Sequence, residues 1–226
     1  MRSIGPDVAD RKAWEWTDIG GEIERWKEPA KAVERFLDRA RGVGAIRVWD
    51  LGCGIGRHTA LLARSGFKVV ATDLSLSGVR LTQERLQSER SRAMLCVADM
   101  VQAPLPSSRV DAVLAFNVIY HGTRDDVALS VAEIARVLRS GGLALITFQS
   151  TRSSKCGSGR PVGRNTFVTV GGHEDGIPHF FAEARDIHEI FSGDFSILEL
   201  THHTEQVPDA SDDRQNCHWV VCVSRT

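Results

Sequence analysis

The 226-residue sequence lacks paired cysteines, long apolar runs and blocks of charge of one sign. Its five cysteines include no C-x-x-C pair, and three of them lie in apolar runs, where a thiol behaves as a small hydrophobic group. We therefore expect a reducing, cytoplasmic setting. No stretch approaches the roughly 20 apolar residues of a membrane span, and residues 1–10 contain no apolar core of signal-peptide length. A soluble protein is expected.

The charges are balanced, with 28 lysines and arginines against 29 acidic residues and a net charge of −1. This balance argues against a protein whose main activity is to grip nucleic acid through its phosphates. The expected partner is a small molecule, with no strong nucleic-acid signal and no membrane, and a homodimer is left open. The length fits one domain with a sizeable core.

Apolar runs alternate with helical periods through the first two thirds of the chain. The runs predict strands at 47–50, 67–73, 93–98, 110–117 and 143–148, and the periods predict helices at 29–42, 59–66, 75–90 and 125–140. Strands that are apolar on both faces and alternate with helices indicate a doubly wound α/β fold with a mostly parallel sheet. Further on, we expect a helix with a lead-in at 178–191 and an antiparallel strand pair at 195–204 and 218–224.

The expected organisation is one domain over 1–226, divided by the role of each part. Residues 1–42 form an N-terminal helical cap, 43–148 a ligand-binding core, 149–181 an irregular substrate-side segment, and 182–226 a helix with the closing strands. Residues 11–27 carry Trp14, Trp16 and Trp26. These tryptophans predict that the leading segment folds over something apolar, either the ligand or the domain's own core.

Glycines alternate directly after the first expected strand, in the order Asp50-x-Gly52-x-Gly54-x-Gly56. Alternate glycines allow a sharp turn and a close approach of the backbone to a ligand. Glycine also serves tight turns for conformational reasons alone. The turn therefore needs support from other residues before it indicates a binding site.

That support comes from polar residues at four expected strand ends, which are Asp50, Asp73, Asp99 and Asn117. In a doubly wound sheet, ligands bind outside the carboxyl ends of the strands. A carboxylate such as that of Asp73 can accept hydrogen bonds from both hydroxyls of a ribose. Each residue singly would serve as a helix cap or loop residue, but the set favours an adenosine-like ligand.

The spacing of the glycines in this turn also distinguishes between binding motifs for two classes of adenosine-containing cofactor. The dinucleotide pattern G-x-G-x-x-G, counted from Gly52, would need glycine where Arg57 stands. The observed pattern resembles motif I of class I S-adenosylmethionine-dependent methyltransferases, over roughly residues 29–148. The resemblance implies a Rossmann-like, seven-stranded sheet, S-adenosyl-L-methionine as cofactor and S-adenosyl-L-homocysteine as its product.

The resemblance also implies the cofactor contacts. The motif I aspartate and glycines would hold the methionine part, Asp73 the ribose and Asp99 the adenine amino group, with Met100 against the ring. The full set of expected cofactor residues is Trp26, Asp50, Gly52, Cys53, Gly54, Gly56, Asp73, Leu74, Ser75, Asp99, Met100, Asn117 and Val118.

The residues after the fourth expected strand indicate the kind of acceptor. Asn117-Val118-Ile119-Tyr120 lacks the two prolines of enzymes that methylate amino groups of DNA bases, and no Pro-Cys nucleophile occurs. Methyl transfer to a small-molecule O, N or S nucleophile is therefore expected. The tryptophans and the stretch 176–181 are similar to those of small bacterial tellurite-resistance and thiopurine-type methyltransferases. The alternatives are a non-catalytic cofactor-binding sensor or scaffold, a nicotinamide oxidoreductase, and an RNA-modifying methyltransferase.

Histidines are the natural bases for a phenol, carboxylic acid or amine acceptor. His121 and Tyr120 follow the fourth expected strand and are the first catalytic candidates, although His121 could equally cap the next helix. His179 is the third candidate. The last two strands hold His202, His203, Cys217, His218 and Cys222 without zinc-ligand spacing, so no metal site is expected. Arg152, Lys155, Arg160 and Arg164 either attract an anionic substrate or form a solvated loop.

Overall fold

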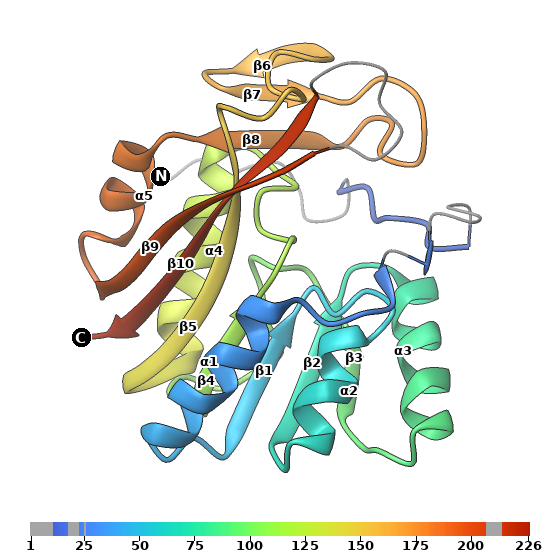
Figure 1. Cartoon of the computed structure of the whole chain (residues 1–226), viewed down its shortest axis with the longest axis vertical. Coiled ribbons are helices and arrows are strands. Elements are labelled where there is room, and N and C mark those ends of the chain that lie inside the picture. The colour runs from blue at the N-terminus through green and yellow to red at the C-terminus, as the bar shows by residue number, and fades with distance from the viewer. Residues whose placement is uncertain (1–10, 18–22, 25, 207–213) are drawn as a thin grey trace, which may run out of the picture.

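The computed structural model describes residues 11–17, 23–24, 26–206 and 214–226, and it has an α/β fold built on one twisted sheet (Figure 1). The sheet contains the path β3-β2-β1-β4-β5, and a branch from this path pairs β10 with β5 and β9 with β10. The first five of these strands pair parallel, whereas β10 pairs antiparallel with both β5 and β9. The expected mostly parallel sheet with a closing antiparallel pair is confirmed.

The elements of this path and its branch lie close to their expected ranges. The strands are β1 (Arg47–Leu51), β2 (Lys68–Asp73), β3 (Met94–Val97), β4 (Val110–Ala115), β5 (Leu138–Ser150), β9 (Phe195–Gln206) and β10 (Gln215–Arg225). The helices are α1 (Lys31–Gly42), α2 (Arg57–Arg64), α3 (Leu76–Ser88), α4 (Arg124–Val137) and α5 (Ala184–Phe191).

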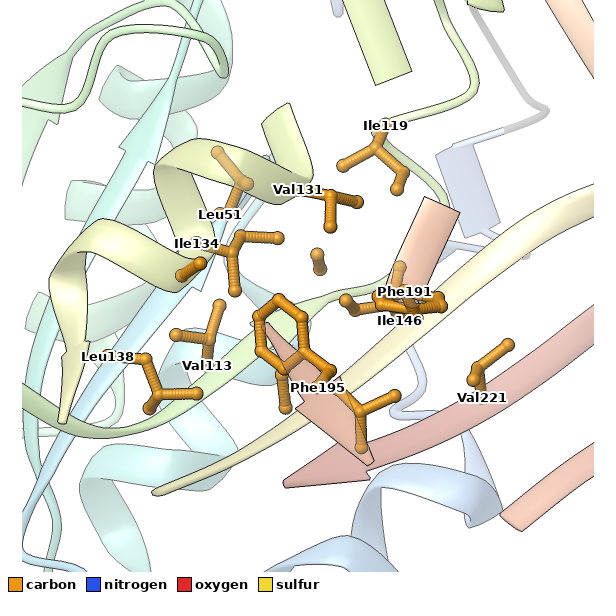
Figure 2. Close-up of a cluster of buried hydrophobic side chains, with 14 of the residues drawn as sticks. Leu51, Val113, Ile119, Val131, Ile134, Leu138, Ile146, Phe191, Phe195 and Val221 are labelled. Atoms are coloured by element: carbon orange, nitrogen blue, oxygen red, sulfur yellow. The ribbon is translucent and has the colours of Figure 1, made fainter. Parts of the chain in front are cut away.

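Helices cover both faces of the sheet because each has an apolar stripe at helical spacing. On one face, Val33, Phe36, Leu37 and Ala40 of α1 pack with Leu62 of α2 against the apolar residues of β1, β2 and β4. On the other face, α4 and α5 pack against β1, β4, β5 and β10, and Figure 2 shows this cluster between the ribbons. Because helices cover both faces of the sheet, only the ends of the strands are left uncovered by helices.

The expected irregular segment at 149–181 is partly wrong, because it contains three short strands. These are β6 (Arg160–Gly163), β7 (Thr166–Val168) and β8 (Pro178–Ala182), which form antiparallel pairs in that order. Among the described residues they extend the sheet to ten strands, since β8 also pairs with the end of β5.

In the expected helix with a lead-in at 178–191, the helix begins at Ala184, and the lead-in is a strand. Residues 178–182 are a strand because Phe180 packs into the core while the backbone of Phe181 and Ala182 pairs with β5. His179 therefore lies on a strand rather than in a loop.

Two segments lie beyond the carboxyl ends of the parallel strands (Figure 1). One is the described part of the N-terminal segment, residues 11–17, which has no helix; the expected cap residues 1–10, 18–22 and 25 lie outside the described residues. The other is the group of strands β6, β7 and β8. Two segments that are distant in the sequence therefore lie at the edge of the sheet where a ligand is expected.

Candidate active site

A cavity of about 1060 Å³ opens at the carboxyl edge of the sheet. Its wall is formed by residues of the N-terminal segment, of the ends of the parallel strands and of the segment after β5. Of the expected cofactor residues, the wall contains Trp26, Gly52, Asp73, Leu74, Asp99, Met100, Asn117 and Val118. The other expected cofactor residues, Asp50, Cys53, Gly54, Gly56 and Ser75, do not line the cavity.

The glycine turn needs its glycines because other chain approaches it closely. At Gly52 φ is +73°, and a Cβ atom there would lie 2.3 Å from a methyl group of Val118. At Gly54 φ is +52°, and a Cβ atom would lie 2.6 Å from the indole of Trp16. The turn is therefore packed between the residue that follows β4 and the N-terminal segment, and a side chain at either position would force them apart.

Asp73 closes the turn from the end of β2. Its Oδ2 atom accepts a hydrogen bond from the backbone nitrogen of Gly54 at 2.7 Å, and its Oδ1 atom accepts one from the nitrogen of Ser75 at 2.8 Å. Burial raises the pKa of Asp73, and these backbone donors oppose the shift. Each oxygen keeps a further lone pair, so the carboxylate can hold the turn and still accept a ribose hydroxyl.

Asp50, which the resemblance assigns to the cofactor, lies behind the wall of the cavity rather than in it. It is 2% exposed, and its Oδ2 atom accepts a hydrogen bond from the Thr59 hydroxyl at 2.6 Å. Burial raises the pKa of Asp50 to about 7. The side chain is buried because β1 continues to Leu51, so Asp50 lies within the sheet rather than at its end. Asp50 instead joins β1 to α2 behind the turn.

Asp99 presents a carboxylate oxygen without a hydrogen bond from the described residues at the cavity. Its Oδ1 atom accepts a hydrogen bond from the nitrogen of Val101 at 3.0 Å, whereas its buried Oδ2 atom has no hydrogen-bond partner among the described residues. The guanidinium of Arg11 approaches this oxygen to 3.4 Å and also pairs with Asp126 at 2.6 Å. A buried carboxylate oxygen needs a donor, and the adenine amino group is a donor of the right kind.

The tryptophans of the N-terminal segment cover the cavity. The rings of Trp14 and Trp16 lie 4.9 Å apart, and Trp26 lies edge-on to both. The backbone nitrogen of Trp16 donates to the Ser77 hydroxyl at 3.2 Å, which fixes the segment to the start of α3. All three rings line the cavity, so this segment folds over the ligand space.

Asn117 has a left-handed backbone, with φ of +57°. Its backbone nitrogen donates to the Thr147 hydroxyl at 2.7 Å, and that hydroxyl donates back to the Asn117 side chain at 3.2 Å. Asparagine tolerates this conformation better than most residues. This backbone turn brings Val118 against Gly52. The conformation of Asn117 therefore fixes the part of the cavity wall that follows β4.

The three catalytic candidates lie together but face different spaces. Tyr120 and His121 line the large cavity, whereas His179 lines a neighbouring cavity of about 200 Å³. The ring centroids of His121 and His179 are 4.8 Å apart. Burial raises the pKa of Tyr120 far above its ordinary value, so its hydroxyl stays protonated and can donate a hydrogen bond but cannot serve as a base.

The residue between these histidines, Glu174, is absent from the sequence-based candidates. Its Oε1 atom lies 3.7 Å from Nε2 of His121 and 3.4 Å from Nε2 of His179. Burial opposes the ionisation of Glu174, but its polar and charged neighbours, Lys155 among them, hold its pKa below the usual range. No spacing rule joins a glutamate in a loop to these histidines, so only tertiary structure could reveal it.

Comparison with known proteins gives a family match over the same core. Residues 49–146 match the family described as "Methyltransferase domain". The chain is 33% identical over 122 residues to a probable S-adenosylmethionine-dependent methyltransferase of Mycobacterium tuberculosis, covering 54% of this chain and 42% of that protein. It is 31% identical over 116 residues to a ubiquinone biosynthesis O-methyltransferase of Rhodopseudomonas palustris, covering 50% and 43%.

The fold likeness extends over nearly the whole chain. The crystal structure of the PH0226 protein from Pyrococcus horikoshii matches with a TM-score of 0.70 and 20% identity, covering 93% of this chain and 95% of that one. The chain spans less than half the length of the two curated relatives above. No helix among the described residues has the length and apolar character needed to cross a membrane.

The match begins at Trp49, just ahead of the glycine turn, and ends in β5, so it contains the strand ends that surround the cavity. The Oδ2 atom of Asp99, which lacks a hydrogen bond among the described residues, and the close-packed glycine turn fit an adenosine-containing group on independent structural grounds. Residues 49–146 therefore resemble a methyltransferase domain, and the cofactor that this likeness indicates is S-adenosylmethionine.

Proposed function

We propose that this protein transfers a methyl group from S-adenosylmethionine to an oxygen, nitrogen or sulfur atom of a small molecule. The observation that carries the proposal is that one cavity contains both the adenosine-binding carboxylates, Asp73 and Asp99, and the acidic and imidazole groups of Glu174 and His121. Its volume of about 1060 Å³ is at the upper end of the range for one ligand. A cofactor and a small acceptor can share it.

The chain's own residues divide the work of binding. Asp73 supplies an acceptor for the ribose hydroxyls, and Asp99 supplies one for the adenine amino group. Met100 and Leu74 form an apolar part of the cavity wall. When bound, the cofactor supplies a methyl group already activated by its sulfonium. The protein then has to align the acceptor with that group and exclude water, and the tryptophans Trp14, Trp16 and Trp26 cover the cavity from the solvent side.

His121 is the group best placed to take a proton from the acceptor. Its Nδ1 atom donates a hydrogen bond to the carbonyl oxygen of Val118 at 3.0 Å, which leaves the lone pair on Nε2 free. Burial lowers the pKa of His121, although Glu174 acts in the opposite direction, so the ring is neutral near pH 7. A neutral imidazole with a free Nε2 can act as a general base.

Tyr120 and His179 have supporting roles in this proposal. The protonated hydroxyl of Tyr120 can donate a hydrogen bond to the acceptor. His179 lies behind Glu174 and does not line the large cavity, so it acts through Glu174 as a positioning residue. The relative named a ubiquinone biosynthesis O-methyltransferase supports a small acceptor with a hydroxyl group.

The proposal is tested by incubating the protein with cofactor labelled in its methyl group and a panel of phenols, thiols, amines and carboxylic acids. We expect label in at least one small acceptor, and we expect His121→Gln to reduce the rate by about 100-fold, as for loss of a general base. The matched control His188→Gln changes an exposed histidine on α5 and should leave the rate unchanged.

Two results would contradict the proposal in different ways. Binding of S-adenosylhomocysteine without transfer to any acceptor would favour a cofactor-binding sensor or scaffold. Transfer to RNA but to no small molecule would favour the RNA-modifying alternative.

A further inference from the structure

Three side chains converge beside the large cavity, whose wall contains two of them. His121 follows β4, Glu174 precedes β8, and His179 lies on β8; one ligand atom from each is within 4.8 Å of the other two. The carboxylate oxygen Oε1 of Glu174 lies 3.7 Å from Nε2 of His121 and 3.4 Å from Nε2 of His179. We propose that these three residues bind a divalent transition-metal ion.

Both imidazoles are oriented as metal ligands are. Nδ1 of His121 lies 3.0 Å from the carbonyl oxygen of Val118, and Nδ1 of His179 lies 3.1 Å from the carbonyl oxygen of Ile177. A carbonyl oxygen can only accept, so each Nδ1 carries the proton and each Nε2 carries a free lone pair. A metal-binding histidine commonly donates its other ring nitrogen to a backbone carbonyl in this way.

The Nε2 atom of His179 is a second, independent indication of a ligand. This side chain is 4% exposed. Its buried Nε2 atom has no hydrogen-bond partner in the described part of the chain. A buried polar atom without a partner is costly, and the cost is removed if Nε2 coordinates an ion. Nδ1 also lies 3.1 Å from the Thr169 hydroxyl, which helps to hold the ring.

Glu174 supplies the negative charge of the site. Its side chain is 15% exposed, and Oε2 lies 3.5 Å from Nζ of Lys155, while Oε1 faces the two histidines. The lysine charge opposes a second cation nearby, but its side chain is 51% exposed, so solvent screens it. Lys155 thereby holds one carboxylate oxygen and leaves the other for the ion.

The donor set and the distances favour zinc or a similar ion. Imidazole and carboxylate ligands bind Zn²⁺ at about 2.0–2.2 Å, with catalytic sites formed by two histidines and one glutamate that leave a fourth position open. Tetrahedral ligands at that distance are about 3.4 Å apart, close to the 3.4 and 3.7 Å observed. All three ligand atoms lie within 4.8 Å of one another, so the site is completed when the histidines move inward.

The position of the site gives it a role that rests on the proposed function. His121 and Glu174 line the large cavity, so the open coordination position would face the acceptor. A hydroxyl or thiol that binds the ion there loses its proton to solvent and is held as an anion, because a bound cation lowers the pKa of its ligand. In the metal-bound protein, His121 is then a ligand, and ion binding replaces its action as a base.

The test uses the full-length chain, treated with a chelator and then titrated with Co²⁺ as a spectroscopic probe and with Zn²⁺ as a competitor. We expect one Co²⁺ per chain with visible absorption bands, displaced by Zn²⁺. Glu174→Gln and His179→Asn should each weaken Co²⁺ binding about 100-fold or more, since second-shell changes alone cost 10–100-fold. His188→Gln, at an exposed helix position, should bind like the parent protein.

The outcomes are separable because metal binding is measured without turnover. Absence of stoichiometric Co²⁺ binding, or equal binding by Glu174→Gln with an unchanged circular dichroism spectrum, overturns the metal site and leaves the proposed function standing. Normal Co²⁺ binding in a protein that binds no S-adenosylhomocysteine would overturn the proposed function and retain the site. Glu174→Gln is nearly isosteric, so it keeps the test valid if His179→Asn fails to fold.

Discussion

Oδ2 of Asp73 accepts a hydrogen bond from the backbone nitrogen of Gly54 at 2.7 Å, which ties the end of β2 to the glycine turn that follows β1. One side chain therefore does two things: it fixes the shape of the turn, and it presents a carboxylate at the cavity wall. Loss of this carboxylate should disturb both the turn and the contact with a ribose.

Asp73→Ala should weaken binding of S-adenosylhomocysteine by about 100-fold or more, because a charged acceptor and the support of the turn are lost together. Isothermal titration calorimetry measures the change. The control Asp38→Ala removes an 81% exposed carboxylate on α1 and should bind normally. Unchanged affinity in Asp73→Ala would show that the cofactor does not use this strand end.

Asp99→Ala should reduce cofactor affinity by about 10- to 100-fold, since a hydrogen bond to a charged group is worth about 1.5–3 kcal/mol. Arg11→Ala serves as the matched comparison, because Arg11 approaches the same oxygen from the N-terminal segment. The loss should be larger for Asp99→Ala and should disappear for a cofactor analogue whose adenine lacks the amino group. Equal losses with both ligands would contradict the assignment of Asp99 to adenine.

Trp16→Phe should lower affinity by about two- to tenfold, in line with an aromatic contact worth about 0.5–1.5 kcal/mol. Binding of S-adenosylhomocysteine should also change the tryptophan fluorescence of the parent protein, and the variant should lose part of that change. Trp49→Phe is the control, since Trp49 is fully buried in β1 and donates to Thr72 rather than lining the cavity. A signal unaffected by Trp16→Phe would mean that this ring does not report on the ligand.

Asp50→Asn should flatten the pH dependence of stability in the cofactor-free protein. Burial raises the pKa of Asp50 from 3.8 to about 7, so between these values the folded state holds a proton that the unfolded state releases. Stability therefore falls as pH rises through this window, by up to about 1.4 kcal/mol per pH unit for one proton. Urea unfolding at several pH values in that window measures the slope, and an identical slope in the variant would rule out Asp50 as its source.

The order of the core elements follows from patterns that act over short distances. Alternating glycines after β1, apolar strand runs and a helical stripe such as Val33, Phe36, Leu37 and Ala40 are each recognisable within a few residues. The same local logic places Asp73 and Asp99 at strand ends, because parallel strands share one carboxyl edge. It fails for β8, where the core position of Phe180 and pairing with β5 decide the conformation.

By itself, the sequence determined the fold class, the glycine turn and the carboxylates at the strand ends, since strand and helix periods and the motif spacing are local properties. Only the tertiary structure decided that Asp50 lies behind the cavity, that Trp14 and Trp16 lie over it, and that Glu174 joins His121 to His179. Contacts such as those of His121 with Glu174 and of Trp16 with Ser77 join residues more than 50 positions apart, and no periodicity or spacing rule encodes such contacts.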